Sequence, residues 1–169
     1  MKLIFLDIDG VLNRTGRPED GRTMPLYNSG IGWDPQLVPQ LAKILNAFRG
    51  EIAIVISSSW RVIANYQPAL FSFAFATWGI SVPVLGCTPS CQASDPMVQD
   101  RRGLEIQMWL DQWKPMKVHH AITSYVVLDD CHDAGAGHED KFVQTIHSKG
   151  LTDDNVAKAI AILKRQEER

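Results

Sequence analysis

Two aspartates near the N-terminus are the residues of this 169-residue chain best suited to chemistry. Asp7 and Asp9 follow the apolar run Leu3–Leu6, and Gly10 comes directly after them. An apolar run that ends in acid and glycine is typical of a central parallel strand, whose carboxyl end is where open α/β sheets bind ligands. Two carboxylates about 4 Å apart repel by roughly 4 kcal/mol at an effective dielectric near 20. Unless the pair is only an acidic turn, a cation or a raised pKa must offset this repulsion.

Polar residues also end two later apolar runs. Ile52–Ile56 is followed by the sequence S-S-S-W-R at residues 57–61, and Tyr125–Leu128 is followed by Asp129 and Asp130. In a parallel sheet with right-handed crossovers these strand ends lie at one edge, so four carboxylates should converge there. Mg2+ prefers such oxygen ligands and keeps several waters.

The turn after the second apolar run adds groups that suit a phosphoryl substrate. The Ser57 hydroxyl and the backbone N–H groups of Ser58 and Ser59 can each donate to a phosphoryl oxygen beside the metal. Arg102, at the start of a later helix, would add positive charge. The combination indicates phosphoryl transfer.

Alternating strands and helices are predicted to position these residues. Strands are expected at 3–6, 52–56, 80–85, 125–128 and 142–146, with the third near a sheet edge because it contains Pro83. Helices are expected at 35–48, 68–78, 102–113 and 153–163, with Asp34 and Thr152 as N-caps. This alternation predicts one doubly wound, Rossmann-like α/β domain over residues 1–169, with about five mostly parallel strands.

Other segments carry weaker signals. Residues 13–33, rich in glycine and arginine, are expected to form a loop or flap over the acidic edge. The apolar side chains of the second helix are expected in the core: Leu70, Phe71, Phe73, Phe75 and Trp78. Zinc at Cys87 and Cys91 is not favoured, because no second ligand pair completes the site. The histidines at 132, 138 and 147 are expected on the surface.

The overall composition is that of an ordinary globular protein. Hydrophobic residues make up 45% and charged residues 21% of the chain, and the formal net charge is −2. This balance gives no global sign of affinity for nucleic acid or membranes. No stretch approaches the roughly 18 apolar residues of a membrane span, and the apolar N-terminus is too short for a signal peptide. A cytoplasmic location without membrane partners is the default expectation.

The arrangement resembles the haloacid dehalogenase (HAD) superfamily. The sequence D-I-D-G at residues 7–10, Ser57, a basic residue at a helix start and the pair Asp129-Asp130 follow the order of that superfamily over nearly the whole chain. The resemblance implies a Mg2+-dependent phosphomonoester hydrolase that forms an aspartyl-phosphate.

The resemblance also implies a role for each matching residue. Asp7 would be the nucleophile and a metal ligand, and Asp9 the general acid and then the base, also at the metal. Asp130 would bind the metal directly and Asp129 through water or by orienting its neighbour, although the choice between them stays open. Ser57 and Arg102 would hold and neutralise the transferring group. Expected substrate contacts are Gly10, Ser58, Ser59 and Arg61.

Two features differ from the common pattern of the superfamily. The basic residue is more often lysine, and here Arg101, Arg102, Lys114 and Lys117 compete; Arg102 is favoured because R-G-L-E-I leads directly into a helical period. The chain also lacks room for a large cap domain, so the site should admit bulky phosphorylated substrates such as nucleic-acid ends. The segments at 57–61 and 102–110 resemble, more weakly, HAD domains found in or near RNA-repair proteins.

Other functions remain open at this level. The substrate could instead be a small nucleotide or sugar phosphate, although Arg14, Arg17, Arg22 and Arg61 could line a nucleic-acid backbone. The chain could also be a HAD-fold binding or regulatory module without turnover, which the intact acidic pair after the first strand disfavours. A phosphoacceptor receiver domain would carry these acids in a different order.

Overall fold

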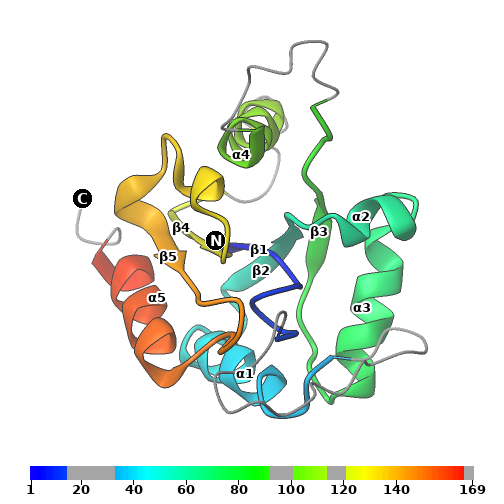
Figure 1. Cartoon of the computed structure of the whole chain (residues 1–169), viewed down its shortest axis with the longest axis vertical. Helices are drawn as coiled ribbons and strands as arrows, with labels where there is room; N and C mark the ends of the chain where they lie inside the picture. Colours follow the sequence, from blue (N-terminus) through cyan, green and yellow to red (C-terminus); the bar gives the residue numbers. More distant parts are fainter. Residues whose placement is uncertain (15–32, 92–100, 114–120, 166–169) are drawn as a thin grey trace.

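A five-stranded parallel sheet organises the molecule, a computed structural model that describes residues 1–14, 33–91, 101–113 and 121–165. The strands lie in the order β3-β2-β1-β4-β5, and every pairing is parallel (Figure 1). Their bounds are β1 Lys2–Leu6, β2 Ile52–Ile56, β3 Val84–Cys87, β4 Ser124–Asp129 and β5 Phe142–Gln144. The predicted α/β architecture is therefore confirmed.

The sheet is covered on both faces. The helices are α1 Val38–Ala47, α2 Trp60–Ile63, α3 Pro68–Thr77, α4 Arg101–Trp113 and α5 Asp153–Arg165, with short 3-10 turns at His132–Gly135 (η2) and Glu139–Lys141 (η3). Ile4 and Leu6 of β1 join a core with α1, α3 and α5, whereas Leu3 and Phe5 join a second core with α4. Alternate residues of one strand thus face opposite helix layers, which explains why Leu3–Leu6 of β1 are all apolar.

Several predicted boundaries need correction. The third strand runs from Val84 to Cys87 rather than 80–85, because Pro83 lacks an N–H and stands just before the strand, where its carbonyl accepts from Ile54 N at 2.9 Å. It does form a sheet edge, as predicted. The fifth strand is likewise shorter than predicted and ends at Gln144.

Helix ends follow the predictions in one case and differ in another. Thr152 caps α5, since Asn155 N donates to Thr152 Oγ1 at 3.3 Å and Thr152 N to Asn155 Oδ1 at 3.0 Å. Asp34 instead caps a preceding turn, where its Oδ1 accepts from Gln36 N at 2.9 Å, and the regular helix α1 begins only at Val38.

The outer side of α3 is more exposed than predicted. Phe71 and Phe75 are buried, but Leu70, Phe73 and Trp78 are 41%, 69% and 38% exposed. Only one side of this uniformly apolar helix faces the sheet, so periodicity could not separate the two sides. Most of the predicted flap at 13–33, together with Lys114 and Lys117, lies outside the described residues. No helix in the described ranges is long and apolar enough to cross a membrane.

Two phenylalanines of α3 provide a matched test of this packing. Phe75 is fully buried, with its ring 4.4 Å from that of Trp33. We expect Phe75→Ala to lower the free energy of unfolding by about 3–5 kcal/mol, because it leaves a cavity. Phe73→Ala, the control on the exposed side, should change it by less than about 1 kcal/mol. Urea unfolding measures both, and equal losses would contradict the described orientation of α3.

Candidate active site

The carboxyl ends of three neighbouring strands meet at one level of the sheet. Leu6 at the end of β1 lies beside Ile56 of β2 and Leu128 of β4. The ladder continues one step further, because Asp7 N donates to Leu128 O at 3.0 Å and Ser57 N donates to Leu6 O at 2.8 Å. The predicted convergence of the polar strand ends is therefore present in the structure.

Arg102 lies between the two most buried acids of this edge. Its Nη1 is 3.3 Å from Asp7 Oδ1 and 3.3 Å from Asp129 Oδ2, and it also donates to the carbonyl oxygen of Ser57. Asp7 is 5% exposed and Asp129 is fully buried. Of the two competing basic residues in the part of the chain that the structure describes, Arg102 reaches the acids, whereas Arg101 is exposed.

Burial and charge shift the pKa values of this cluster. Burial and the Asp7 carboxylate raise the pKa of Asp129 to about 8, although Arg102 acts in the opposite direction. Burial also raises the pKa of Asp7, more than Arg102 and a hydrogen bond from Ser58 lower it. Burial alone would lower the pKa of Arg102, but Asp129 and Asp7 raise it above its usual value. Arg102 therefore stays charged between Asp7 and Asp129, but its charge does not fully offset the rise in their pKa values that burial causes.

The second aspartate of the opening pair has different partners. Asp9 is half-buried, and its Oδ2 accepts from Trp60 Nε1 at 2.7 Å while its Oδ1 accepts from Asn13 Nδ2 at 3.3 Å. Neither partner carries a charge. Asp7 and Asp9, one residue apart, thus have separate environments, one beside a cation and one held by neutral N–H donors.

Asp129 and Asp130 form the part of the site best able to hold a metal ion. Among the described residues, ligand atoms of Asp129, Asp130 and Cys131 lie within 4.8 Å of one another. Asp7 approaches this group through Arg102, which contacts both Asp7 and Asp129. Carboxylate oxygens in excess of the nearby positive charge fit a hard divalent cation.

Gly10 allows Asp130 to reach this position. Gly10 has φ +79°, and a Cβ built on it would overlap the Asp130 side chain. Its carbonyl oxygen accepts from Thr145 Oγ1 at 2.7 Å, which ties the turn after β1 to the segment after β5. Glycine is therefore required here for both backbone conformation and space.

The turn after β2 presents one buried hydroxyl without a partner. Ser57 Oγ is buried and makes no hydrogen bond, so it is free to donate to a bound group. Ser58 is fully buried and hydrogen-bonds Asp7, whereas Ser59 is exposed. An orphaned buried hydroxyl beside a carboxylate and a guanidinium is an arrangement that suits an anionic ligand.

Arg61, predicted to contact the substrate, is instead buried in an ion pair with Glu105. It is 5% exposed, its Nη2 lies 2.7 Å from Glu105 Oε2, and its Nη1 donates to Ser58 O at 3.1 Å. The guanidinium therefore braces the serine turn against α4. The other oxygen of Glu105 accepts from Cys91 N at 2.9 Å. Sequence reasoning missed Glu105, whose only signal is its position one turn after Arg102 on the buried side of α4.

The start of α4, which carries Arg102, is fixed by the segment after β4. Asp133 Oδ2 accepts from Arg102 N at 3.3 Å, and a Cβ on Gly103 would overlap the carbonyl of Ala136. His138 is 2% exposed, with Nε2 3.1 Å from Gly103 O and Nδ1 2.9 Å from Tyr125 OH. The predicted surface position of His138 is thus wrong, because the docked helix covers it.

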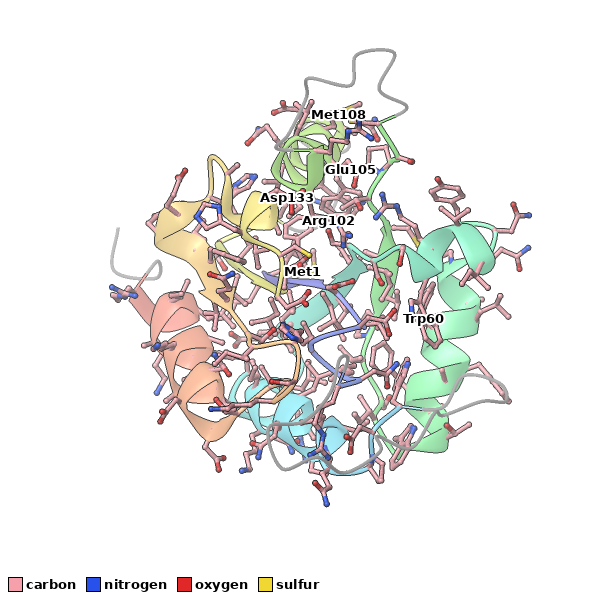
Figure 2. All side chains as sticks on the ribbon, in the orientation of Figure 1. Met1, Trp60, Arg102, Glu105, Met108 and Asp133 are labelled. Atoms are coloured by element: carbon pink, nitrogen blue, oxygen red, sulfur yellow. The ribbon has the colours of Figure 1, made fainter. Side chains whose placement is uncertain are left out.

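Figure 2 shows Arg102, Glu105 and Asp133 gathered on the sheet side of α4, with Trp60 approaching from α2. His132 and His147 are exposed, as predicted. Cys87 and Cys91 are free thiols, and the thiol of Cys91 lies 3.5 Å from Met108 Sδ.

Two glycines with nearly equal positive φ angles, Gly10 and Gly137, test the contact with Asp130. We expect Gly137→Ala, where nothing lies near the added Cβ, to cost about 1–2 kcal/mol from its positive φ alone. Gly10→Ala should cost clearly more, because the Cβ also displaces the Asp130 carboxyl. Urea unfolding compares the two, and equal costs would contradict the close approach.

The raised pKa of Asp129 predicts a pH dependence of stability. The native metal-free protein keeps a proton on Asp129 that the unfolded chain loses above its ordinary pKa of 3.8, so this contribution is lost as pH rises through about 8. We expect the melting temperature of the parent to fall from about pH 5 to about pH 8.5 more than that of Asp129→Asn, which cannot titrate.

Calorimetry in the presence of a chelator measures this difference. Asp154→Asn, at an exposed acid of α5, is the control and should follow the parent. Parallel curves for the parent and Asp129→Asn would mean that Asp129 is already ionised in the native state.

Comparison with known proteins yields one match. A family model described as the HAD domain in Swiss Army Knife RNA repair proteins matches residues 3–156. No curated protein and no solved structure matches the chain.

Proposed function

The chain belongs to the family of HAD domains in Swiss Army Knife RNA repair proteins, and from this premise we propose that it is a Mg2+-dependent phosphomonoester hydrolase. Membership of this family indicates a hydrolase of the phosphatase type. The proposal adds the metal, an aspartyl-phosphate intermediate and a phosphorylated nucleic-acid end as substrate.

One observation carries the proposal. Arg102 Nη1 lies 3.3 Å from Asp7 Oδ1, and the neighbouring Ser57 Oγ is buried without a partner. The proposed nucleophile, a cation and a residue with an unused hydroxyl therefore lie at the adjoining ends of β1 and β2. A phosphoryl group placed on Asp7 would give both Arg102 and Ser57 the anionic oxygens they are arranged to bind.

The proposed reaction has two steps. Asp7 attacks phosphorus while the bond to the leaving oxygen breaks, and Asp9 gives that oxygen a proton. Asp9 then takes a proton from a water whose oxygen bonds to phosphorus, and the bond between phosphorus and Asp7 breaks. Asp7 and Asp9 are thereby restored to their starting protonation states.

The acidic residues of the site support the metal. Asp7, Asp129 and Asp130 would hold Mg2+, whose charge would favour the ionised forms of Asp7 and Asp129 against the burial that raises their pKa values. Arg102 stays charged through the cycle and neutralises the transferring group. Metal binding by Asp9 remains a prediction from the resemblance, since its side chain contacts Trp60 and Asn13.

The proposed substrate class rests on the family rather than on the predicted arginines. The relatives that define the family are RNA repair proteins by description. Arg14 and Arg61 are engaged by Asp34 and Glu105, at 2.6 Å and 2.7 Å, which leaves them poorly placed to follow a nucleic-acid backbone. Arg17 and Arg22 lie outside the described residues.

Release of inorganic phosphate from an aryl phosphate tests the activity. We expect the parent to turn over with Mg2+ and to stop with a chelator, and Asp7→Asn to lose at least about 10³-fold, because the amide cannot form the intermediate. Asp154→Asn is the control for a distant acid. A parent that is inactive with every divalent metal would sink the proposal.

The same assay separates the substrate classes. Oligonucleotides with a 3′- or a 5′-phosphate are compared with free nucleotides and sugar phosphates at equal concentration. Higher kcat/KM for one class of oligonucleotide end supports the nucleic-acid proposal. Equal or higher values for the small compounds would make the protein a small-molecule phosphatase.

A further inference from the structure

We propose that Trp60 is a positioning residue for Asp9, and that its indole N–H selects Oδ1 of Asp9 as the oxygen that carries the catalytic proton. The inference rests on the proposed function, because Asp9 must act as acid and base for the selection to matter. Trp60 is the first residue of α2 and lies outside the groups proposed to carry the reaction.

The contact itself is short and between residues of different elements. Trp60 Nε1 donates to Asp9 Oδ2 at 2.7 Å, across a separation of 51 residues. The indole N–H can only donate, so this bond forms with an acceptor oxygen and offers no proton path of its own. An oxygen that already accepts a short N–H bond is the poorer site for a further proton. The proton is therefore carried on Oδ1.

The other oxygen has a weaker partner of fixed orientation. Asn13 Nδ2 reaches Asp9 Oδ1 at 3.3 Å, a longer contact than that of the indole. The amide cannot rotate freely, because its Oδ1 accepts from the backbone N–H of Asp34 at 3.2 Å. Oδ1 is thus oriented by a neutral donor but held less tightly than Oδ2, as a site that gives and takes protons requires.

Trp60 is itself held in place. Its backbone N donates to Ser58 Oγ at 3.4 Å, and its half-buried ring packs against the core that contains α1 and α3. Its neighbour Arg61 is anchored by the buried pair with Glu105 on α4. Figure 2 shows Trp60 on the α2 side of the site, across from Arg102. The segment that follows β2 therefore contacts both acids, because Ser58 hydrogen-bonds Asp7 and Trp60 hydrogen-bonds Asp9.

The selection gives each proton transfer a defined path. In the first step the proton leaves Asp9 Oδ1 for the leaving oxygen as the bond from that oxygen to phosphorus breaks. In the second step a water proton moves to Oδ1 as the water oxygen bonds to phosphorus and the Asp7 carboxylate departs. Without the indole, the carboxyl group of Asp9 can rotate and place its proton on either oxygen, so fewer encounters are productive.

An opposite role for the same contact is the main competitor. The indole could hold Asp9 away from the substrate, in which case removing it would raise the rate. A purely structural role would lower stability without changing one chemical step more than another. The experiments below distinguish these roles.

The first experiment does not require activity. The chain has five tryptophans, and the indole N–H signal of Trp60 in a 1H–15N spectrum is the one that Trp60→Phe removes. We expect Asp9→Ala to shift this signal to lower proton frequency and leave that of Trp113, stacked on Trp109 in α4, in place. An unchanged Trp60 signal in Asp9→Ala overturns the inference.

The second experiment uses the leaving group. In single turnovers of p-nitrophenyl phosphate with Mg2+, Trp60→Phe should release p-nitrophenolate within about twofold of the parent rate, because this stabilised anion can leave without a proton. Release of the alcohol from 2-phenylethyl phosphate should slow by at least about tenfold, since an alkoxide must be protonated as it leaves. Trp113→Phe should match the parent with both substrates.

A variant with preserved shape controls for packing. Replacing Trp60 by 3-benzothienylalanine exchanges the N–H for sulfur in a ring of the same size, and it should reproduce the selective loss of Trp60→Phe. Equal slowing with both substrates, no slowing, or a faster rate overturns the positioning role. A parent that shows the indole contact but hydrolyses neither substrate overturns the proposed function instead, and leaves Trp60 a structural partner of Asp9.

Discussion

The contact of Arg102 with Asp7 and Asp129 is the interaction on which the rest of the site depends. Three parallel strands bring their carboxyl ends to one level, which forces two buried acids together. Without a nearby cation, their repulsion and loss of hydration would favour either protonation or a displaced strand end. A single guanidinium, 3.3 Å from each acid, allows both to stay at the edge of the sheet.

Arg102 comes from α4, which packs on the face of the sheet opposite α1, α3 and α5. Several neighbouring contacts hold the start of this helix in place. Arg102 stands in the first turn of α4, where a cation opposes the helix dipole. Asp133 offsets this by accepting from Arg102 N, and His138 binds the carbonyl of Gly103. The buried pair of Glu105 and Arg61 joins the next turn of α4 to the serine turn after β2. The helix is therefore fixed on two sides, and the charge it carries is fixed with it.

The features of this site that could be predicted are those that depend on residues close together in the sequence. The runs before Asp7, Ser57 and Asp129 are short, apolar and ended by polar residues. Parallel pairing in register then brings their ends together without further information. Arg102 was identified because the helical period of α4 begins beside it. The five-stranded sheet and the cap of α5 at Thr152 were likewise predictable from residues close in sequence.

The missed features depend on residues far apart in the chain. Glu105 pairs with Arg61 across 44 positions, and His138 binds the backbone of Gly103 across 35, so neither shows in any local period. α2 spans only Trp60–Ile63, too short for a hydrophobic repeat to reveal it. The exposed Phe73 of α3 could not be told from the buried Phe75, because the helix is apolar on every side and only packing selects the covered one.

Asp7 and Asp9 differ in the charge of their partners: Asp7 contacts the cation of Arg102, and Asp9 accepts from neutral N–H donors. A cation beside Asp9 would hold a carboxylate ionised, which suits the nucleophile proposed at Asp7 but not the proton donor and acceptor proposed at Asp9. Neutral donors from Trp60 and Asn13 orient the carboxyl group of Asp9 without placing a charge beside it. Asp7 and Asp9, two aspartates separated by one residue, thus have different surroundings, because Asp7 faces the guanidinium of Arg102 and Asp9 faces the indole of Trp60.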